Sequence, residues 1–152
     1  MTNTTPLITL AGIGLLDLLP LLYEEVWAPR VVLDEYQAKA PPNEPDLTQV
    51  SWLKVVDDVL IDPALSLLDV GEAAVLSLAQ MMGARLILLD ERKARQIAAR
   101  MGLRVAGTLA VLLRAKQQGL LAAVQPYITQ MQSQGRRFHP DLIAHLLEDA
   151  GE

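Results

Sequence analysis

Residues 71–120 decide the fold, and they read GEAAVLSLAQMMGARLILLDERKARQIAARMGLRVAGTLAVLLRAKQQGL. Apolar residues recur at helical spacing from Gly71 to Met82, and Gly83 ends that helix. Leu86 to Leu89 is a short apolar run of the kind that forms a central parallel strand. A basic helix at about 92–101, a strand at 103–105 and a helix at about 108–119 follow. Alternating strands and helices predict a parallel α/β sheet with helices on both faces.

The same alternation extends upstream. A hydroxyl residue followed by proline, Thr5-Pro6, predicts a helix start. Three prolines between Ala40 and Asp46 predict a loop, and the weak alternation of Trp52 to Val56 predicts an edge strand. Further helices are expected at about 6–11, 14–22, 30–39, 121–134 and 140–149, and a further strand at about 25–28. The 152 residues predict one domain, 1–152, with a helical C-terminal extension from about 121 to 152.

Composition excludes several classes of protein. Half of the residues are apolar and few are aromatic, which suits helices on a parallel sheet and argues against a β-sandwich. The chain has no cysteine, so disulfides, a thiolate nucleophile and a zinc finger are excluded. No basic segment precedes the apolar run from Leu7 to Leu22, and Gly12, Gly14 and Pro20 interrupt that run. We therefore expect a cytoplasmic protein without a signal peptide or membrane span.

Charge is distributed unevenly along the chain. Residues 1–72 contain three Lys/Arg and twelve Asp/Glu, whereas residues 73–152 contain ten Lys/Arg and six Asp/Glu. This asymmetry is compatible with a polyanion that docks on the second half while its scissile phosphate lies over metal held by the first. It is equally compatible with ordinary solvated helix faces.

Four acidic or amide residues are predicted to share one edge of the sheet. Each follows a strand, opens a helix or lies about one turn into the helix after a strand: Asn3, Glu35, Glu72 and Asp90. In a parallel α/β fold, strand C-termini and the following helix N-termini lie at the same edge, where ligands bind. Converging carboxylates repel one another unless a cation lies between them, so a divalent ion is expected.

Each of these residues also has a simpler interpretation. Glu72 can stabilise a helix dipole, and Asp90 can cap the next helix. Glu35 can belong to a solvated acidic face, with the choice over Asp34 left open by the pattern alone. Asn3 can form an Asx-turn. The four residues taken together favour the metal site.

The order G-E-A, apolar strand, L-D-E-R and G-T-L within residues 71–120 resembles the PIN-domain family. The segments NTTPLITLAGIGLLDLL and FHPDLIAHLLEDAG are similar to it as well. Within the family, these segments more closely resemble a bacterial and archaeal subgroup related to VapC-type toxins. The resemblance implies a three-layer α/β/α fold with strand order 3-2-1-4-5. It also implies a pocket that binds Mg²⁺ or Mn²⁺ and cleaves single-stranded RNA.

By position, the four family acids fall on Asn3, Glu35, Glu72 and Asp90, and the hydroxyl residue after the first acid falls on Thr4. The chain departs from the family pattern in two ways. Asn3 stands where an Asp is usual, and an amide is an uncharged ligand. Only two residues precede Asn3, so either the first strand is minimal or the true start lies upstream.

Other polar residues have two interpretations each. Arg92, Lys93 and Arg95 can hold RNA phosphates or form a solvated helix face. Thr108 can contribute to a phosphate site at a helix N-terminus or act as a simple cap, and Glu91 can support the metal site or be a helix-start charge. His139 and His145 lack ligand spacing and are expected at the surface. An apolar stripe is expected to be core or a dimer interface: Leu142, Ile143, Leu146 and Leu147.

The leading hypothesis is a Mg²⁺- or Mn²⁺-dependent ribonuclease, interpreted as the toxin of a toxin–antitoxin pair. Its expected partners are RNA, a small antitoxin protein and a second copy of the chain. The alternative is a PIN-fold module that has lost strong metal binding and binds RNA or a protein. A phospho-acceptor receiver domain would need a second acid at the first strand and a Lys near the last strand, and the sequence has neither.

Overall fold

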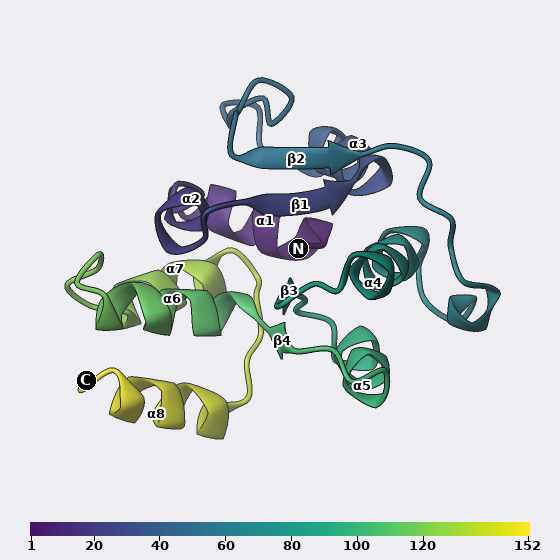
Figure 1. Ribbon diagram of the computed structural model, residues 1–152. Coiled ribbons are helices and arrows are strands. Elements are labelled where there is room, and N and C mark those ends of the chain that lie inside the picture. Colours follow the sequence, from purple (N-terminus) through teal and green to yellow (C-terminus); the bar gives the residue numbers. More distant parts are fainter.

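The computed structural model describes residues 1–152 as a mixed α/β fold (Figure 1). Four short strands form two parallel pairs: β1 (Val26–Pro29) with β2 (Leu53–Val56), and β3 (Ile87–Leu88) with β4 (Val105–Ala106). The helices are α1 (Thr4–Gly12), α2 (Leu18–Leu22), α3 (Arg30–Lys39), α4 (Val70–Met82), α5 (Arg92–Arg100), α6 (Thr108–Gln117), α7 (Gln125–Ser133) and α8 (Pro140–Asp149). A 3₁₀-helix, η1, spans Pro63–Leu65.

The first residues of the chain lie between the two strand pairs. The Thr2 backbone N–H donates to the Trp27 carbonyl of β1 at 3.0 Å, and the Asn3 N–H donates to the Leu88 carbonyl of β3 at 3.1 Å. Thr2 also forms an isolated parallel bridge with Leu88. Hydrogen bonds thus join residues 1–3 to both pairs, and they place Asn3 at the carboxyl end of β3. The full order of five strands stays a prediction.

The core is one cluster of 36 buried apolar residues. Helix α4 contributes most densely, because every residue from Gly71 to Ala79 is buried. Helices α1 and α4 both contact α3, while α6 contacts α2 and α8. No helix is both long and apolar enough to cross a bilayer. The packing fixes the N-termini of α1 and α4 and the body of α3 relative to one another, which matters for the site.

Several predicted bounds are corrected. The first helix begins at Thr4, so Asn3 and not Thr5 is its N-cap. The helix expected at 14–22 is shorter than predicted and corresponds to α2, Leu18–Leu22. Gly14 has a φ of +71°, a left-handed conformation that is incompatible with a helix starting at this residue. The helix expected from 121 begins at Gln125. The 3₁₀-helix η1 was not predicted.

The C-terminal apolar stripe is divided between core and surface. Leu146 is buried, and Ile143 and Leu147 pack against the core, whereas Leu142 is 51% exposed. Both histidines are exposed, as expected, and the His139 ring accepts a hydrogen bond from the Asp141 N–H at the start of α8.

Candidate acidic site

The N-terminus of α4 holds Glu72 in place through a capping box. The Asp69 carboxylate accepts from the Glu72 N–H at 2.8 Å, and Glu72 Oε2 accepts from the Asp69 N–H at 3.3 Å. This reciprocal pair satisfies two backbone donors that a helix start otherwise leaves free. It also turns the Glu72 side chain back toward the helix start, where it is only 6% exposed.

Negative charge accumulates around Glu72. Burial raises the pKa of the Glu72 carboxyl above its usual value, and the nearby carboxylates of Asp69, Glu91 and Glu35 raise it further. These residues come from the N-termini of α4 and α5 and from the body of α3. A carboxyl group with a raised pKa in acidic surroundings indicates a place where a cation would be stabilised.

Glu35 is engaged through both of its carboxylate oxygens. The Thr4 hydroxyl donates to Oε2 at 2.9 Å, and the Lys39 ammonium lies 2.6 Å from Oε1. Burial opposes ionisation of this carboxyl, but the hydrogen bonds from Lys39 and Thr4 outweigh it and lower the Glu35 pKa. Thr4 therefore connects the start of α1 to α3, and it aims one oxygen of Glu35 inward.

Asn3 contributes a buried side-chain oxygen without a hydrogen-bond partner near Glu35. The residue is 4% exposed, and its side-chain Oδ1 is buried without a hydrogen-bond donor. Buried polar atoms are rarely left without a partner, so such an atom indicates a missing ligand or water.

Gly71 provides the space into which these oxygens converge. A Cβ at this position would lie 3.1 Å from Glu35 Oε2, 3.2 Å from Asn3 Oδ1 and 3.5 Å from Asp69 Oδ1. Three oxygens from separate segments thus surround the position that a Cβ would occupy in any other residue. Carboxylate and amide oxygens are the ligands preferred by Mg²⁺ and Mn²⁺, so the donor set fits a hard divalent cation.

Asp90 lies at the carboxyl end of β3, where its two oxygens accept from the N–H and the hydroxyl of Thr108. Asp90 was predicted to cap the helix that follows it in the sequence, α5. It caps the N-terminus of α6 instead. Gly107 permits this approach, since a Cβ there would lie 3.0 Å from Asp90 Oδ1. Thr108 is itself almost fully buried, and its hydroxyl donates to Asp90. The part predicted for Thr108 in a phosphate site stays a prediction.

The predicted residues are brought together to different degrees. Asn3 and Glu35 meet at Gly71, and Glu72 lies within electrostatic reach of Glu35. In the conformation described, no group of three or more His, Cys, Asp or Glu side chains is arranged to hold a metal ion. The carboxylates of Glu35, Glu72 and Asp90 already accept hydrogen bonds from other groups of the chain. The donors are on Thr4, Lys39, Asp69 and Thr108. The assignment of ligands stays a prediction.

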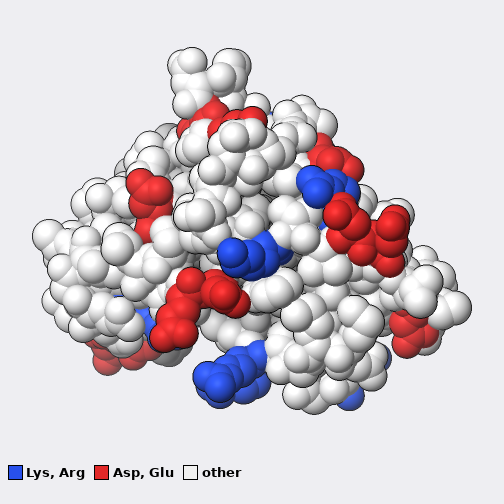
Figure 2. Space-filling model, turned by 45° about the horizontal axis from the view of Figure 1, so that its top comes forward, with Lys and Arg blue, Asp and Glu red and all other residues white.

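The basic residues proposed for RNA are exposed on the first turn of α5. Lys93 donates to the Leu67 carbonyl at 2.8 Å and Arg95 to the Leu89 carbonyl at 3.4 Å, while Arg92 has no such partner. Glu91 is the N-cap of α5, and its negative charge helps to raise the pKa of Glu72. On the face that Figure 2 shows, acidic and basic side chains lie near one another.

Sequence reasoning missed three participants: Asp69, Lys39 and Gly71. Asp69 and Glu72 have the spacing of a capping box, which could have identified Asp69. Glu35 and Lys39 have the i,i+4 spacing of a helical ion pair. Nothing in the pattern shows that Gly71 lies against Asn3, because that contact depends on how α1, α3 and α4 pack.

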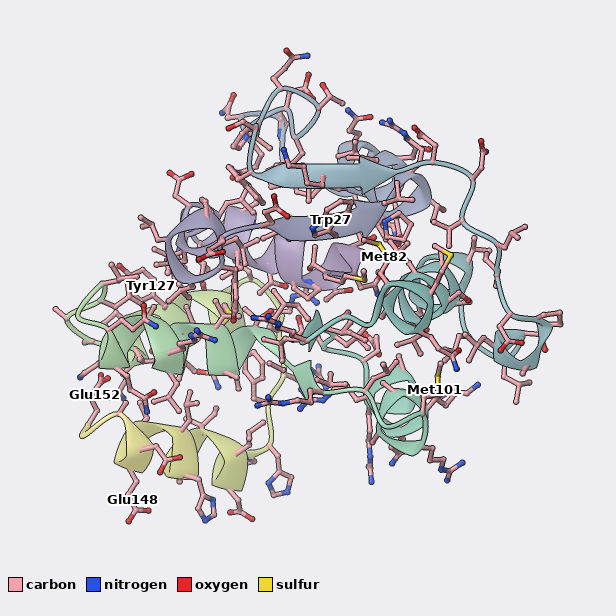
Figure 3. All side chains as sticks on the ribbon, in the orientation of Figure 1. Trp27, Met82, Met101, Tyr127, Glu148 and Glu152 are labelled. Atoms are coloured by element: carbon pink, nitrogen blue, oxygen red, sulfur yellow. The ribbon has the colours of Figure 1, made fainter.

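A separate cleft of about 760 Å³ opens at the other edge, at the amino ends of the strands. Trp27 of β1 and Met82 of α4, which Figure 3 labels next to each other, contribute to its lining. Arg85, Arg104 and Arg114 line it as well. None of the four predicted metal residues does, so this cleft is distinct from the acidic site.

Comparison with known proteins gives one result. A family model described as a PIN domain matches residues 1–152. Searches of curated proteins and of solved structures give no match.

Proposed function

The chain belongs to the PIN-domain family, and from this premise we propose that it is a divalent-metal-dependent ribonuclease that hydrolyses phosphodiester bonds in single-stranded RNA. The observation that supports this most directly is the buried, unpartnered Oδ1 of Asn3, which meets Glu35 Oε2 and Asp69 Oδ1 at Gly71. The proposal includes the three-layer arrangement with strand order 3-2-1-4-5, supported by the hydrogen bonds of residues 1–3 to β1 and β3.

Asn3, Glu35, Glu72 and Asp90 would hold the ion, and Asp69 adds an oxygen at the same place. Bound Mg²⁺ or Mn²⁺ supplies charge neutralisation at the scissile phosphate and an activated water. Asn3 contributes a neutral oxygen, so the net charge of the site depends on the carboxylates.

The supporting residues of the chain orient these ligands. Thr4 holds Glu35 Oε2 toward Asn3, and the Asp69 backbone holds Glu72 against the start of α4. Thr108 keeps Asp90 at the end of β3. Ligands whose own rotamers are held by hydrogen bonds bind with less loss of entropy, which is the role that such supporting contacts have in metal sites.

The RNA backbone would reach the site along α5. Arg92 is exposed without a partner, and Lys93 and Arg95 lie within three residues of it, so the three can contact phosphates that flank the scissile bond. Contacts to phosphate carry no sequence information, so this surface would set affinity and register only.

The cellular role that we propose is that of a toxin restrained by a small antitoxin protein. An Arg-bearing peptide could pair with the acidic site by bidentate hydrogen bonds. A homodimer is part of the same proposal, with the exposed Leu142 of α8 as its apolar contact.

A second candidate function is a PIN-fold module that binds RNA or a protein without catalysis. Two observations favour it: the amide at Asn3, and the engagement of Glu35, Glu72 and Asp90 by donors of the chain itself.

An RNA cleavage assay with and without Mn²⁺ separates the two functions. We expect cleavage of a single-stranded substrate that EDTA abolishes and that Glu72→Gln reduces by at least about a hundredfold. Arg92→Ala should weaken substrate binding while cleavage of saturating RNA persists. RNA binding without cleavage in the wild-type chain, at any Mn²⁺ concentration, would favour the second function.

A further inference from the structure

Lys39 places a positive charge at the acidic site. It is the last residue of α3, one turn beyond Glu35, and its ammonium nitrogen lies 2.6 Å from Glu35 Oε1. The other oxygen of the same carboxylate, Oε2, faces Asn3 at Gly71. One carboxylate therefore connects the ammonium group to the oxygens proposed as metal ligands.

The pairing is not confined to one helix. The hydrogen bond and the charge of Glu35 raise the pKa of the Lys39 ammonium, and the carboxylate of Asp69, at the N-cap of α4, raises it too. Lys39 thus responds to acids from two elements that meet only in the folded chain. It is the only Lys or Arg that forms an ion pair with any of the four predicted ligand residues.

The Lys39 side chain can leave this position readily. It is 61% exposed, and exposed i,i+4 ion pairs contribute little to stability. A divalent ion beside Glu35 would repel the ammonium group and attract the carboxylate more strongly than a monovalent cation does.

We propose that Lys39 is an internal cation that competes with the divalent ion for Glu35. This inference rests on the proposed metal site. In the metal-free chain, Lys39 neutralises part of the charge that Glu35, Asp69 and Glu72 bring together. On metal binding its ammonium group moves into solvent and frees Glu35 Oε1. Lys39 thereby weakens metal affinity and sets the ion concentration at which the site fills.

The test compares Lys39→Met with Lys54→Met. Methionine keeps an unbranched side chain of similar length and good helix propensity while removing the charge. Lys54 lies exposed on β2 without an ion pair, so its substitution controls for the change in net charge. Mn²⁺ is titrated into each metal-free chain by calorimetry at fixed ionic strength.

Lys39→Met should bind Mn²⁺ about three- to tenfold more tightly than Lys54→Met, because the competing cation is gone. Its melting temperature should also rise more on addition of Mn²⁺ than that of Lys54→Met. Lys39→Arg, which retains the charge, should resemble the wild type in both measurements.

Two outcomes would overturn the inference, and they are distinguishable. If both methionine variants bind Mn²⁺ with equal affinity, Lys39 does not compete and the metal site itself stands. If neither the variants nor the wild type bind Mn²⁺, the proposed metal site fails and the inference fails with it.

Discussion

Asp90 and Thr108 form a two-point contact in which the Thr108 N–H donates to Oδ1 and its hydroxyl donates to Oδ2, each at 2.7 Å. The contact joins the end of β3 to the start of α6 across 18 residues. Thr108 is 2% exposed, so water does not replace Asp90 readily as its acceptor. Asp90 therefore has a structural role whether or not it binds metal, and variants at this position need a matched structural control.

Asp90→Ala should destabilise the fold by about 2–4 kcal/mol, because it leaves two buried donors of Thr108 without an acceptor. Thr108→Val removes only the hydroxyl bond and should cost about 1 kcal/mol. Urea unfolding in EDTA measures both. Asp149→Ala, at an exposed position on α8, is the control and should change stability by less than about 0.5 kcal/mol. Equal stability of Asp90→Ala and this control would show that the contact contributes nothing.

Glu72 should make the metal-free fold less stable as pH rises from acid to neutral. Its folded pKa is raised, chiefly by burial, so above the ordinary carboxyl range the unfolded chain releases a proton that the folded chain still holds. Glu72→Gln removes this penalty and can retain the capping contact. The stability of the variant relative to wild type should therefore improve between about pH 4 and pH 7. Urea unfolding in EDTA at the two pH values tests this, and a constant difference would contradict it.

Glu35 should have the opposite pH dependence. Lys39 and Thr4 lower its folded pKa against the effect of burial, so its ionised form stabilises the fold. That stability is present above the ordinary carboxyl pKa and is lost as pH falls through the folded value. Glu35→Gln should thus be less stable than wild type at about pH 7 and approach it near pH 3. Urea unfolding in EDTA at the two pH values measures this, and a stability difference that does not change with pH would contradict the prediction.

The fold followed from the sequence where local signals agreed. Helix α3 has the predicted bounds, and α4 ends at Gly83, whose φ of +63° suits glycine. The prediction failed at residues 14–22, because an apolar run that turns at Gly14 has the same composition as a continuous helix. Periodicity reports which face is buried, and it does not report where the backbone changes direction.

The site was predictable only in part for a related reason. Chain direction alone placed Asn3 and Glu35 at the same edge, and the two meet at Gly71. The pair of Glu35 and Lys39 has the i,i+4 spacing of a helical ion pair, so a spacing rule could have found it. The contact between Asp90 and Thr108 could not be predicted in this way, because it joins residues 18 apart in the sequence and depends on how α6 packs in the fold.

Gly71→Ala tests whether the oxygens around Gly71 bind metal. The added methyl group would lie 3.1 Å from Glu35 Oε2 and 3.2 Å from Asn3 Oδ1, and it would occupy the space between them. Alanine favours a helix by up to about 1 kcal/mol over glycine, so the fold should be retained. Mn²⁺ affinity should fall by at least about tenfold, as measured by calorimetry.

Gly83→Ala provides the contrast. Its positive φ strains alanine, so it should lower stability by about 1 kcal/mol while leaving Mn²⁺ affinity unchanged. If Gly71→Ala binds Mn²⁺ as tightly as the wild type, the metal does not bind at the oxygens around Gly71.

Asn3→Asp separates the ribonuclease from the non-catalytic module. The new carboxylate would be almost fully buried beside Glu35 Oε2 and Asp69 Oδ1, so in EDTA it should lower the melting temperature by charge repulsion. In a working metal site it adds Coulomb attraction on the order of a few kcal/mol before desolvation is subtracted, so Mn²⁺ should bind about tenfold more tightly or better. RNA cleavage should rise or persist. Asn43→Asp, in the exposed loop after α3, makes the same chemical change and should alter neither quantity. A destabilised Asn3→Asp chain with no gain in Mn²⁺ affinity would remove the support for the ribonuclease.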